Sequence, residues 1–299
     1  MRRSLFFLFL LTLAAFSQSD LPQLSYKADP DWPQLPPNTN LVETPAVTVD
    51  PAENVYIFHR GNPPILVYDK SGKFLRGLGH GLFDSPHGLR IAPDGSLWAI
   101  DNGSHFVVKM DAMTGRVKMV LGRRRTAGEA ENLFDKPTDV AFGPNGDIYV
   151  SDGYGNSRVA QFSKDGKFIR AWGKRGVNPG EFNTPHAVVL DKQNKLYVAD
   201  RENFRIQIFD QEGKFQQMWT HVGSPWGLSL TQDDMLFMTD GYNNRILKLD
   251  LDGKIVGSLG EFGKLPGQLD LPHHMAVGPS GNIYVGEIVN LRAQRFVPR

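Results

Sequence analysis

The sequence predicts an all-β fold, a six-bladed β-propeller whose blades have four strands each, on three observations. One pattern recurs six times in the 299 residues, and each repeat opens with a proline. The repeats begin at Pro45, Pro86, Pro137, Pro185, Pro225 and Pro272. Their spacing of about 40 to 51 residues is the period of a propeller blade. The repeats also resolve into short β-type runs separated by turn residues.

The repeat that begins at Pro137 shows the expected strands most clearly. Ile, Val, Tyr and Phe, which favour strands, dominate its β-type runs. The runs comprise Asp139–Phe142, Asp147–Ser151, Arg158–Ser163 and Lys167–Trp172. Asn145-Gly146 and Asp165-Gly166 lie between paired runs and are typical of tight hairpin turns. Since no long helical periodicity competes, four strands in each repeat indicate the propeller.

The sixth repeat is shorter than the others and has room for three strands only. We expect the segment before Pro45, near Leu24–Ala28, to supply the missing outer strand, because closing the ring removes an exposed sheet edge. Residues 20–44 are then an N-terminal strap that includes the closing strand. Residues 45–299 form the propeller itself.

The first 19 residues have the layout of a secretory signal peptide. Arg2 and Arg3 precede an apolar run from Leu5 to Phe16, and a small-residue segment follows it. An uncleaved membrane anchor is the alternative, although the run is shorter than the roughly 20 residues that a membrane span needs. We therefore expect a signal peptide over 1–19, a secreted or periplasmic protein, and no membrane association after cleavage.

Composition excludes some classes of partner. The net charge is +1 with 22% charged residues, which is not the basic surface of a nucleic-acid-binding protein. The chain has no cysteine, so no disulfide can form and a lipid-anchor cleavage site is excluded. Because a closed propeller is stable by itself, we expect a monomer.

The residue after each opening proline alternates in a way that predicts a metal site. In chain order these residues are Ala46, His87, Thr138, His186, Trp226 and His273. Histidines in blades two, four and six would lie about 120° apart around the propeller axis. One such histidine alone would more simply line the channel. Three that converge form a metal site with an open position, and zinc is the first choice for neutral imidazoles.

The ends of the second strands carry a repeated acidic residue. These residues are Asp101, Asp152, Asp200, Asp240 and Glu287. Because they recur in five blades, we expect them to bind loop backbone N–H groups rather than to take part in chemistry. The arginines of a repeated Asn-x-Arg pattern, such as Arg158 and Arg205, are interpreted as blade scaffolding for the same reason.

Three further residues are expected at the same mouth of the channel. Arg60 and Arg201 follow the ends of second strands in blades one and four, and arginine suits the two-point binding of a carboxylate. Each is also compatible with an ordinary surface salt bridge. Tyr154 lies on the same face, where a metal and arginines could lower its pKa and make it a base; loop packing is the alternative. Tyr242 occupies the matching place in blade five.

Several strings stand out beyond the general repeat. They are Phe58-His59-Arg60-Gly61, Pro86-His87-Gly88-Leu89, Pro137-Thr138-Asp139-Val140-Ala141, Ser151-Asp152-Gly153-Tyr154-Gly155-Asn156-Ser157-Arg158, Pro185-His186, Ala199-Asp200-Arg201-Glu202-Asn203 and Pro272-His273. On these strings the repeats resemble NHL repeats. The chain after its leader resembles, as a whole, the peptidyl-α-hydroxyglycine α-amidating lyase family.

The resemblance implies a zinc-dependent lyase. It would cleave the C–N bond of a peptidyl α-hydroxyglycine, or a similar hemiaminal, to give an amide and glyoxylate. The family's zinc ligands fall on His87, His186 and His273. Its catalytic residues fall on Tyr154, Arg60 and Arg201, with Tyr154 taking the hydroxyl proton and an arginine binding the substrate carboxylate. A small peptide is then the expected partner.

The chain departs from the family at several points, one of them Leu271 in place of a methionine. Animal members have an aspartate after the third histidine that helps hold a structural calcium ion, and His274 stands there in this chain, so Ca²⁺ stays an open question beside Zn²⁺. Gly155 replaces a cysteine. An alternative function also stays open: a non-catalytic secreted NHL propeller that binds a peptide or protein at the channel mouth. A propeller lactone hydrolase is disfavoured, because such sites typically use carboxylate and amide ligands.

Overall fold

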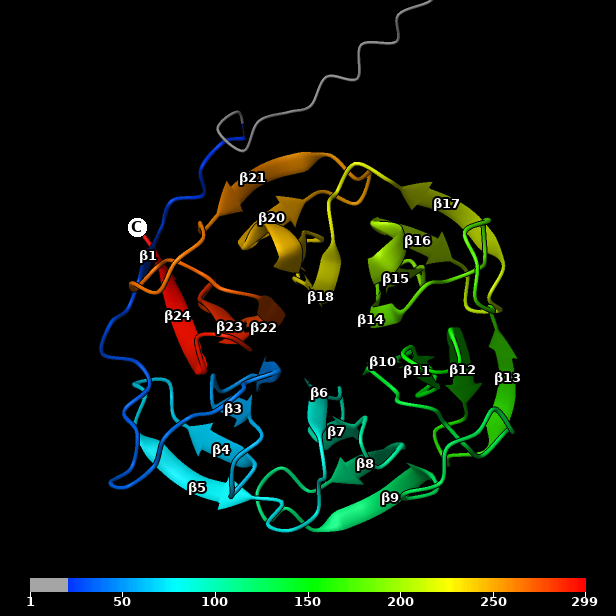
Figure 1. Ribbon diagram of the computed structural model, residues 1–299, viewed down its shortest axis with the longest axis horizontal. Coiled ribbons are helices and arrows are strands. Elements are labelled where there is room, and N and C mark those ends of the chain that lie inside the picture. The colour runs from blue at the N-terminus through cyan, green and yellow to red at the C-terminus, as the bar shows by residue number, and fades with distance from the viewer. Residues whose placement is uncertain (1–20) are drawn as a thin grey trace, which may run out of the picture.

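The computed structural model describes residues 21–299, so the expected signal peptide lies outside the described residues. The described residues form six four-stranded antiparallel sheets arranged in a ring, which confirms the predicted propeller (Figure 1). The strands are β1 (Tyr26–Ala28), β2 (Ala46–Val49), β3 (Val55–Phe58), β4 (Ile65–Tyr68), β5 (Phe74–Leu78), β6 (Pro86–Ile91), β7 (Leu97–Asp101), β8 (Phe106–Met110), β9 (Val117–Gly122), β10 (Asp139–Phe142), β11 (Ile148–Asp152), β12 (Arg158–Phe162), β13 (Phe168–Trp172), β14 (Pro185–Leu190), β15 (Leu196–Asp200), β16 (Arg205–Phe209), β17 (Phe215–Trp219), β18 (Pro225–Leu230), β19 (Leu236–Asp240), β20 (Arg245–Leu249), β21 (Ile255–Leu259), β22 (Pro272–Val277), β23 (Ile283–Glu287) and β24 (Arg292–Pro298).

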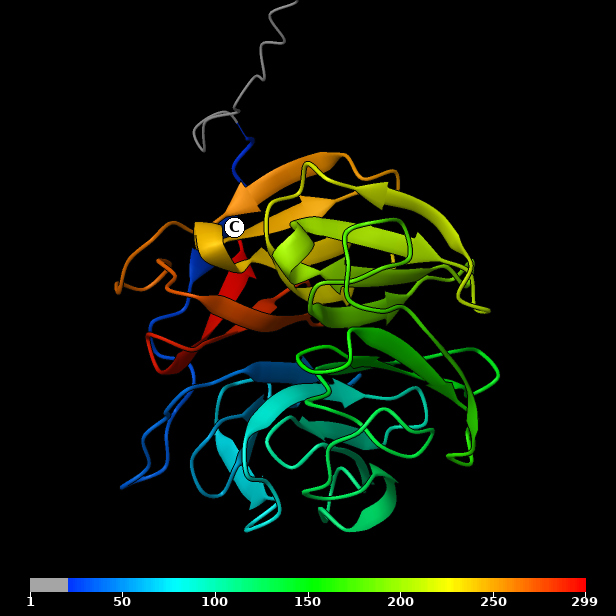
Figure 2. The same ribbon diagram turned by 45° about the vertical axis from the view of Figure 1, so that its right-hand side comes forward.

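Blades one to five each use four consecutive strands, from β2–β5 to β18–β21. The first strand of each blade lies nearest the centre of the ring and the fourth lies at its rim (Figure 1). The turned view in Figure 2 shows the blades stacked side by side around the axis. Two short 3-10 helices, η2 (Arg201–Asn203) and η3 (Gly241–Asn243), follow the second strands of blades four and five. No helix among residues 21–299 is long and apolar enough to cross a membrane.

Blade six is completed by the N-terminal segment, as the sequence predicts. Its strand order is β1-β24-β23-β22, and Tyr26 of β1 pairs with Pro298 of β24. The strap that follows β1 seals the neighbouring seam: Trp32 is buried, with its ring 5.2 Å from that of Tyr284 in blade six and 6.4 Å from that of Tyr68 in blade one. The two ends of the described chain therefore close the ring together.

The hydrophobic core is divided among the six seams between blades. Each apolar cluster combines residues from two neighbouring sheets; one joins blades four and five through side chains such as Ile206 and Leu228. Because both faces of a sheet are covered, the second strands are buried along their whole length, whereas β13 at the rim is mostly exposed. This explains why the inner strands are nearly continuous apolar runs in the sequence.

The acidic residues at the ends of the second strands hold the loops between blades. Asp200 accepts hydrogen bonds from the backbone N–H of Asn183 at 2.7 Å and from Nε of Arg205 at 2.7 Å, and both side chains are buried. Blades three, five and six repeat the ion pair with Asp152–Arg158, Asp240–Arg245 and Glu287–Arg292. The scaffolding interpretation of these carboxylates and arginines is thus confirmed by their contacts.

Candidate metal centre

Three histidines converge on the axis at one end of the channel. His87, His186 and His273 are the second residues of β6, β14 and β22. Their ring centroids lie 4.8 Å apart for His87 and His186, and 4.7 Å apart for each of the other two pairs. All three are buried. The alternation in the sequence has therefore brought three imidazoles to one point.

Each of the three imidazoles is held by the blade that follows it. The Nδ1 atoms lie 2.7–2.8 Å from backbone carbonyl oxygens, which can only accept a hydrogen bond. The acceptors are Thr138 for His87, Trp226 for His186 and Pro45 for His273. The proton of each neutral ring is therefore on Nδ1, and Nε2 keeps a free lone pair. Backbone anchoring of this kind is common for histidines that bind a metal.

Electrostatics keep these rings neutral. Burial lowers the pKa of His87 to about 3. Burial, helped by the positive charge of Arg201, also holds the pKa of His186 well below its ordinary value, and burial does the same for His273. A neutral imidazole is the form that binds a metal. The donor set therefore fits a divalent metal ion that accepts nitrogen ligands.

A β-bulge adds a fourth imidazole. In β22, Pro272 pairs with Glu287 and Met275 pairs with Val285, so His273 and His274 both stand opposite a single residue. Bulges re-aim side chains in this way beside functional sites. One nitrogen from each of the four histidines lies within 4.8 Å of those of the others. The sequence analysis named His274 only as the replacement for an aspartate. Its place directly after His273 was the signal that it could share the site.

The matching bulge positions in blades two and five carry glycine. A Cβ atom on Gly88 would lie 2.4 Å from the carbonyl oxygen of Thr138, and one on Gly227 would lie 2.6 Å from that of His273. Neither position has space for a side chain. Blade six differs, because His274 fits there with 2% of its surface exposed.

Tyr154 reaches the histidines from the loop after β11. Its hydroxyl oxygen lies 3.2 Å from Nε2 of His87 and 3.1 Å from Nε2 of His186. It accepts a hydrogen bond from Nη1 of Arg201 at 3.0 Å, so its own proton can point toward either Nε2. Burial raises the pKa of Tyr154, although the charges of Arg201 and Arg60 oppose this. The lowered pKa that we expected depends on a bound metal as well as on the arginines, and a bound cation beside the oxygen would lower the pKa further.

The two predicted arginines occupy different settings. Arg201 is buried, with its guanidinium 4.3 Å from the ring centre of Trp226 and its Nε donating to Glu202 at 2.8 Å. Arg60 is exposed, and its charge acts on His87 and Tyr154 from the rim of the site. Arg201 is therefore fixed in direction, whereas Arg60 is free to meet a ligand from solvent.

Trp226 and Glu202 were not predicted as site residues. Trp226 occupies the position of the histidines in blade five, and its ring packs 5.2 Å from His186 and 5.3 Å from His273. Glu202 accepts hydrogen bonds from Arg201 and, at 3.2 Å, from the hydroxyl of Tyr242. The break in the alternation at Trp226 and the acidic residue after Arg201 were the available signals.

Comparison with known proteins identifies the family. A family model described as a six-bladed β-propeller matches residues 129–246. Human NHL repeat-containing protein 3 is 34% identical over 302 aligned residues, which cover 92% of this chain and 85% of that protein. The chain belongs to the NHL-repeat family of six-bladed propellers.

This NHL-repeat propeller is also similar to proteins of peptide amidation. Peptidyl-glycine α-amidating monooxygenase A of Xenopus laevis is 33% identical over 310 aligned residues, covering 90% of this chain. The chain spans only 33% of the length of that relative. A probable peptidyl-α-hydroxyglycine α-amidating lyase of Caenorhabditis elegans is 42% identical over 151 residues, which are 50% of this chain and 43% of that protein.

A solved structure supports the fold alone. A streptogramin B lyase structure superposes on this NHL-repeat propeller with a TM-score of 0.63 at 16% identity, covering 88% of this chain and 95% of the other. At that identity the likeness extends to the arrangement of blades and not to the residues of the site.

Proposed function

We propose that the protein is a zinc-dependent lyase that cleaves the C–N bond of a peptidyl α-hydroxyglycine, or a similar hemiaminal, to an amide and glyoxylate. The observation that carries the proposal is the group of neutral imidazoles with unprotonated Nε2 atoms beside Tyr154 and Arg201. The similarity to the amidating lyase of Caenorhabditis elegans supports the choice of reaction.

His87, His186 and His273 would hold the zinc ion, which fits three nitrogen ligands and an open position. When bound there, zinc would supply Lewis-acid chemistry toward the substrate hydroxyl. Calcium, by contrast, prefers oxygen ligands, so we do not propose it beside His274.

The remaining residues supply proton transfer and positioning. Tyr154, in its deprotonated form, would accept the proton of the substrate hydroxyl. The electron pair of that O–H bond then forms the C=O bond of glyoxylate as the C–N bond breaks. The departing amide nitrogen takes back one proton, which Tyr154 can return. Arg201 and Arg60 would bind the terminal carboxylate of the substrate, Arg201 from a fixed direction and Arg60 from the exposed rim.

A second candidate function rests on the human relative. NHL repeat-containing protein 3 matches 92% of this chain and carries no reaction in its name. A propeller that binds a peptide at the same mouth without chemistry would need the arginines but not the lone pairs on the Nε2 atoms. The two candidates therefore differ in whether activity depends on metal.

The decisive experiment is elemental analysis of the purified protein followed by an assay for glyoxylate. We expect about one zinc ion per chain, and release of glyoxylate from a synthetic peptidyl α-hydroxyglycine that stops after chelation and returns with zinc. Absence of any transition metal in the wild type would remove the lyase proposal. Metal without glyoxylate release, together with tight peptide binding, would favour the second candidate.

A further inference from the structure

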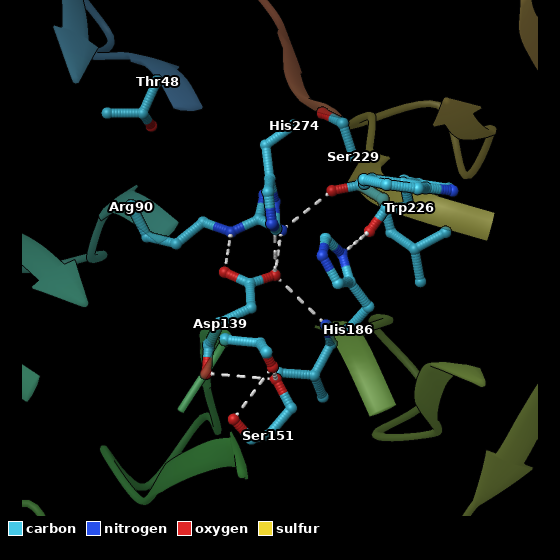
Figure 3. Close-up of polar contacts among 12 residues, drawn as sticks. Thr48, Arg90, Asp139, Ser151, His186, Trp226, Ser229 and His274 are labelled. Carbon is cyan, nitrogen blue, oxygen red and sulfur yellow. Dashed lines mark hydrogen bonds and ion pairs between the residues drawn. The ribbon is translucent and has the colours of Figure 1, made fainter. Parts of the chain in front are cut away.

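His274 is a buried imidazole that the proposed reaction does not use. Its ring lies 5.0 Å from that of His273 and is stacked 5.3 Å from that of His186. Figure 3 shows it reaching the axis from blade six, where Arg90 and Asp139 arrive from blades two and three. The surroundings of its two nitrogens indicate what it does.

Nδ1 of His274 faces a carboxylate. It lies 4.0 Å from Oδ2 of Asp139, which is fully buried. That carboxylate is itself held in place, since Nε of Arg90 donates to Oδ1 at 2.9 Å and the backbone N–H of Val188 donates to Oδ2 at 3.1 Å. Asp139 is therefore a fixed negative charge near Nδ1 of His274, beyond hydrogen-bonding distance, and its attraction favours a proton on that nitrogen.

Nε2 of His274 is buried and has no hydrogen-bond partner among residues 21–299. An unpaired polar atom in the interior is costly, typically by about 1–3 kcal/mol, so such atoms usually have a ligand or a water. In the other three histidines of the group a carbonyl oxygen accepts the Nδ1 proton, so Nε2 carries the lone pair; the Tyr154 hydroxyl lies within hydrogen-bonding distance of Nε2 in His87 and His186. His274 belongs to the same group of nitrogens within 4.8 Å.

We propose that His274 is a fourth ligand of the metal, through Nε2, and that Asp139 is the positioning residue that orients it through Nδ1. The inference rests on metal binding in the proposed function and changes the nature of the site. Four imidazoles would fill a tetrahedral shell, so substrate could bind only if the ion accepts a fifth ligand. The site should then favour ions that do so readily, Cu²⁺ or Ni²⁺ included, more than a three-histidine site does.

The first test counts ligands in the wild-type protein. Metal-free protein is loaded with Co²⁺ or Zn²⁺, and X-ray absorption at the metal edge is fitted for the number of imidazole ligands. Four imidazoles support the proposal, whereas three overturn it. Because the measurement uses the wild type, a variant that fails to fold cannot leave the question open.

The second test assigns the fourth ligand to His274. Co²⁺ is titrated into the wild type, His274→Gln and His80→Ala, and visible absorption reports its coordination number. We expect His274→Gln to change the visible bands, because one imidazole is lost from the four-coordinate shell, and to weaken Co²⁺ binding at least about tenfold, as loss of a ligand or of its support does. His80 is exposed and its replacement should change nothing. Identical spectra and affinities in all three proteins would refute the assignment.

These outcomes separate this inference from the proposed reaction. If the protein binds metal through three histidines and releases glyoxylate, the lyase proposal stands and the fourth-ligand proposal is refuted. If it binds metal through four histidines and releases no glyoxylate, the fourth-ligand proposal stands and the lyase proposal is refuted. A protein that binds no Co²⁺ or Zn²⁺ contradicts both.

Discussion

Two buried positions recur in the blades, and they differ in how they vary. The end of the second strand carries a carboxylate in five blades, and in blade four it holds a loop N–H and an arginine. The position after the opening proline changes from blade to blade, and only blades two, four and six place histidine there. Both positions are almost free of solvent. In this repeat protein, a residue that is the same in most blades supports each blade. A residue that changes in a regular order from blade to blade acts together with its equivalents across the ring.

The largest effect should follow from breaking the alternation. His186→Ala removes an Nε2 atom from the group, so we expect loss of bound metal and a fall of lyase activity to background. The free energy of unfolding should fall by about 1–3 kcal/mol, since the buried carbonyl oxygen of Trp226 loses the donor at Nδ1. Elemental analysis, glyoxylate release and thermal unfolding measure the three quantities. Full metal content in this variant would contradict the role of the alternation.

A substitution at the end of the second strand should instead lower mainly the stability of the fold. Asp200→Ala leaves the guanidinium of Arg205 buried without its partner, which should lower the free energy of unfolding by about 3–5 kcal/mol. Urea unfolding measures this change. Asp165→Ala, at an exposed hairpin turn, is the control and should stay within about 0.5 kcal/mol of the wild type. Equal stabilities would mean that the repeated carboxylates do not support the blades.

Tyr154 and Tyr242 occupy matching places in blades three and five, so the same substitution can be compared at a site residue and at its repeat equivalent. Tyr154→Phe removes the hydroxyl next to two Nε2 atoms, so kcat should fall about 10²–10⁴-fold while metal content stays the same. Tyr242→Phe loses only a hydrogen bond to Glu202 and should change kcat by less than about threefold. Similar losses in both variants would argue against proton transfer by Tyr154.

The smallest effect is expected at Glu202. Glu202→Gln removes the negative charge beside Nε of Arg201 but keeps an acceptor, and the pair is partly exposed. We expect KM for a substrate with a terminal carboxylate to change about two- to fivefold, with kcat nearly constant. Steady-state kinetics against a substrate amidated at that terminus provides the control. A large loss of kcat would instead place Glu202 in the chemistry.

The repeats made most of the fold predictable. Each strand expected after Pro137 agrees with its observed counterpart within one residue at either end, because period, turns and apolar runs all indicate the same elements. The closing strand near Leu24–Ala28 was predicted from the missing strand of blade six, and β1 lies within that range.

The site was less fully predictable. The alternation identified three histidines, but the bulge that turns His274 inward depends on strand register, which a single sequence does not reveal. The contacts of Trp226 and Glu202 likewise arise from neighbouring blades that lie far apart along the chain. The desolvation that raises the pKa of Tyr154 in the metal-free site is likewise a property of the assembled ring.

Ring closure has a consequence for the order in which the protein matures. Nδ1 of His273, in the last blade, is held by the carbonyl oxygen of Pro45, at the start of the first. That contact crosses the seam between blades six and one, which Trp32 also covers, so the third histidine is oriented only after the first and last blades have met. A metal ion captured by these imidazoles would thus report that the ring has closed, and chains arrested with an open seam would remain distinguishable by their lack of metal.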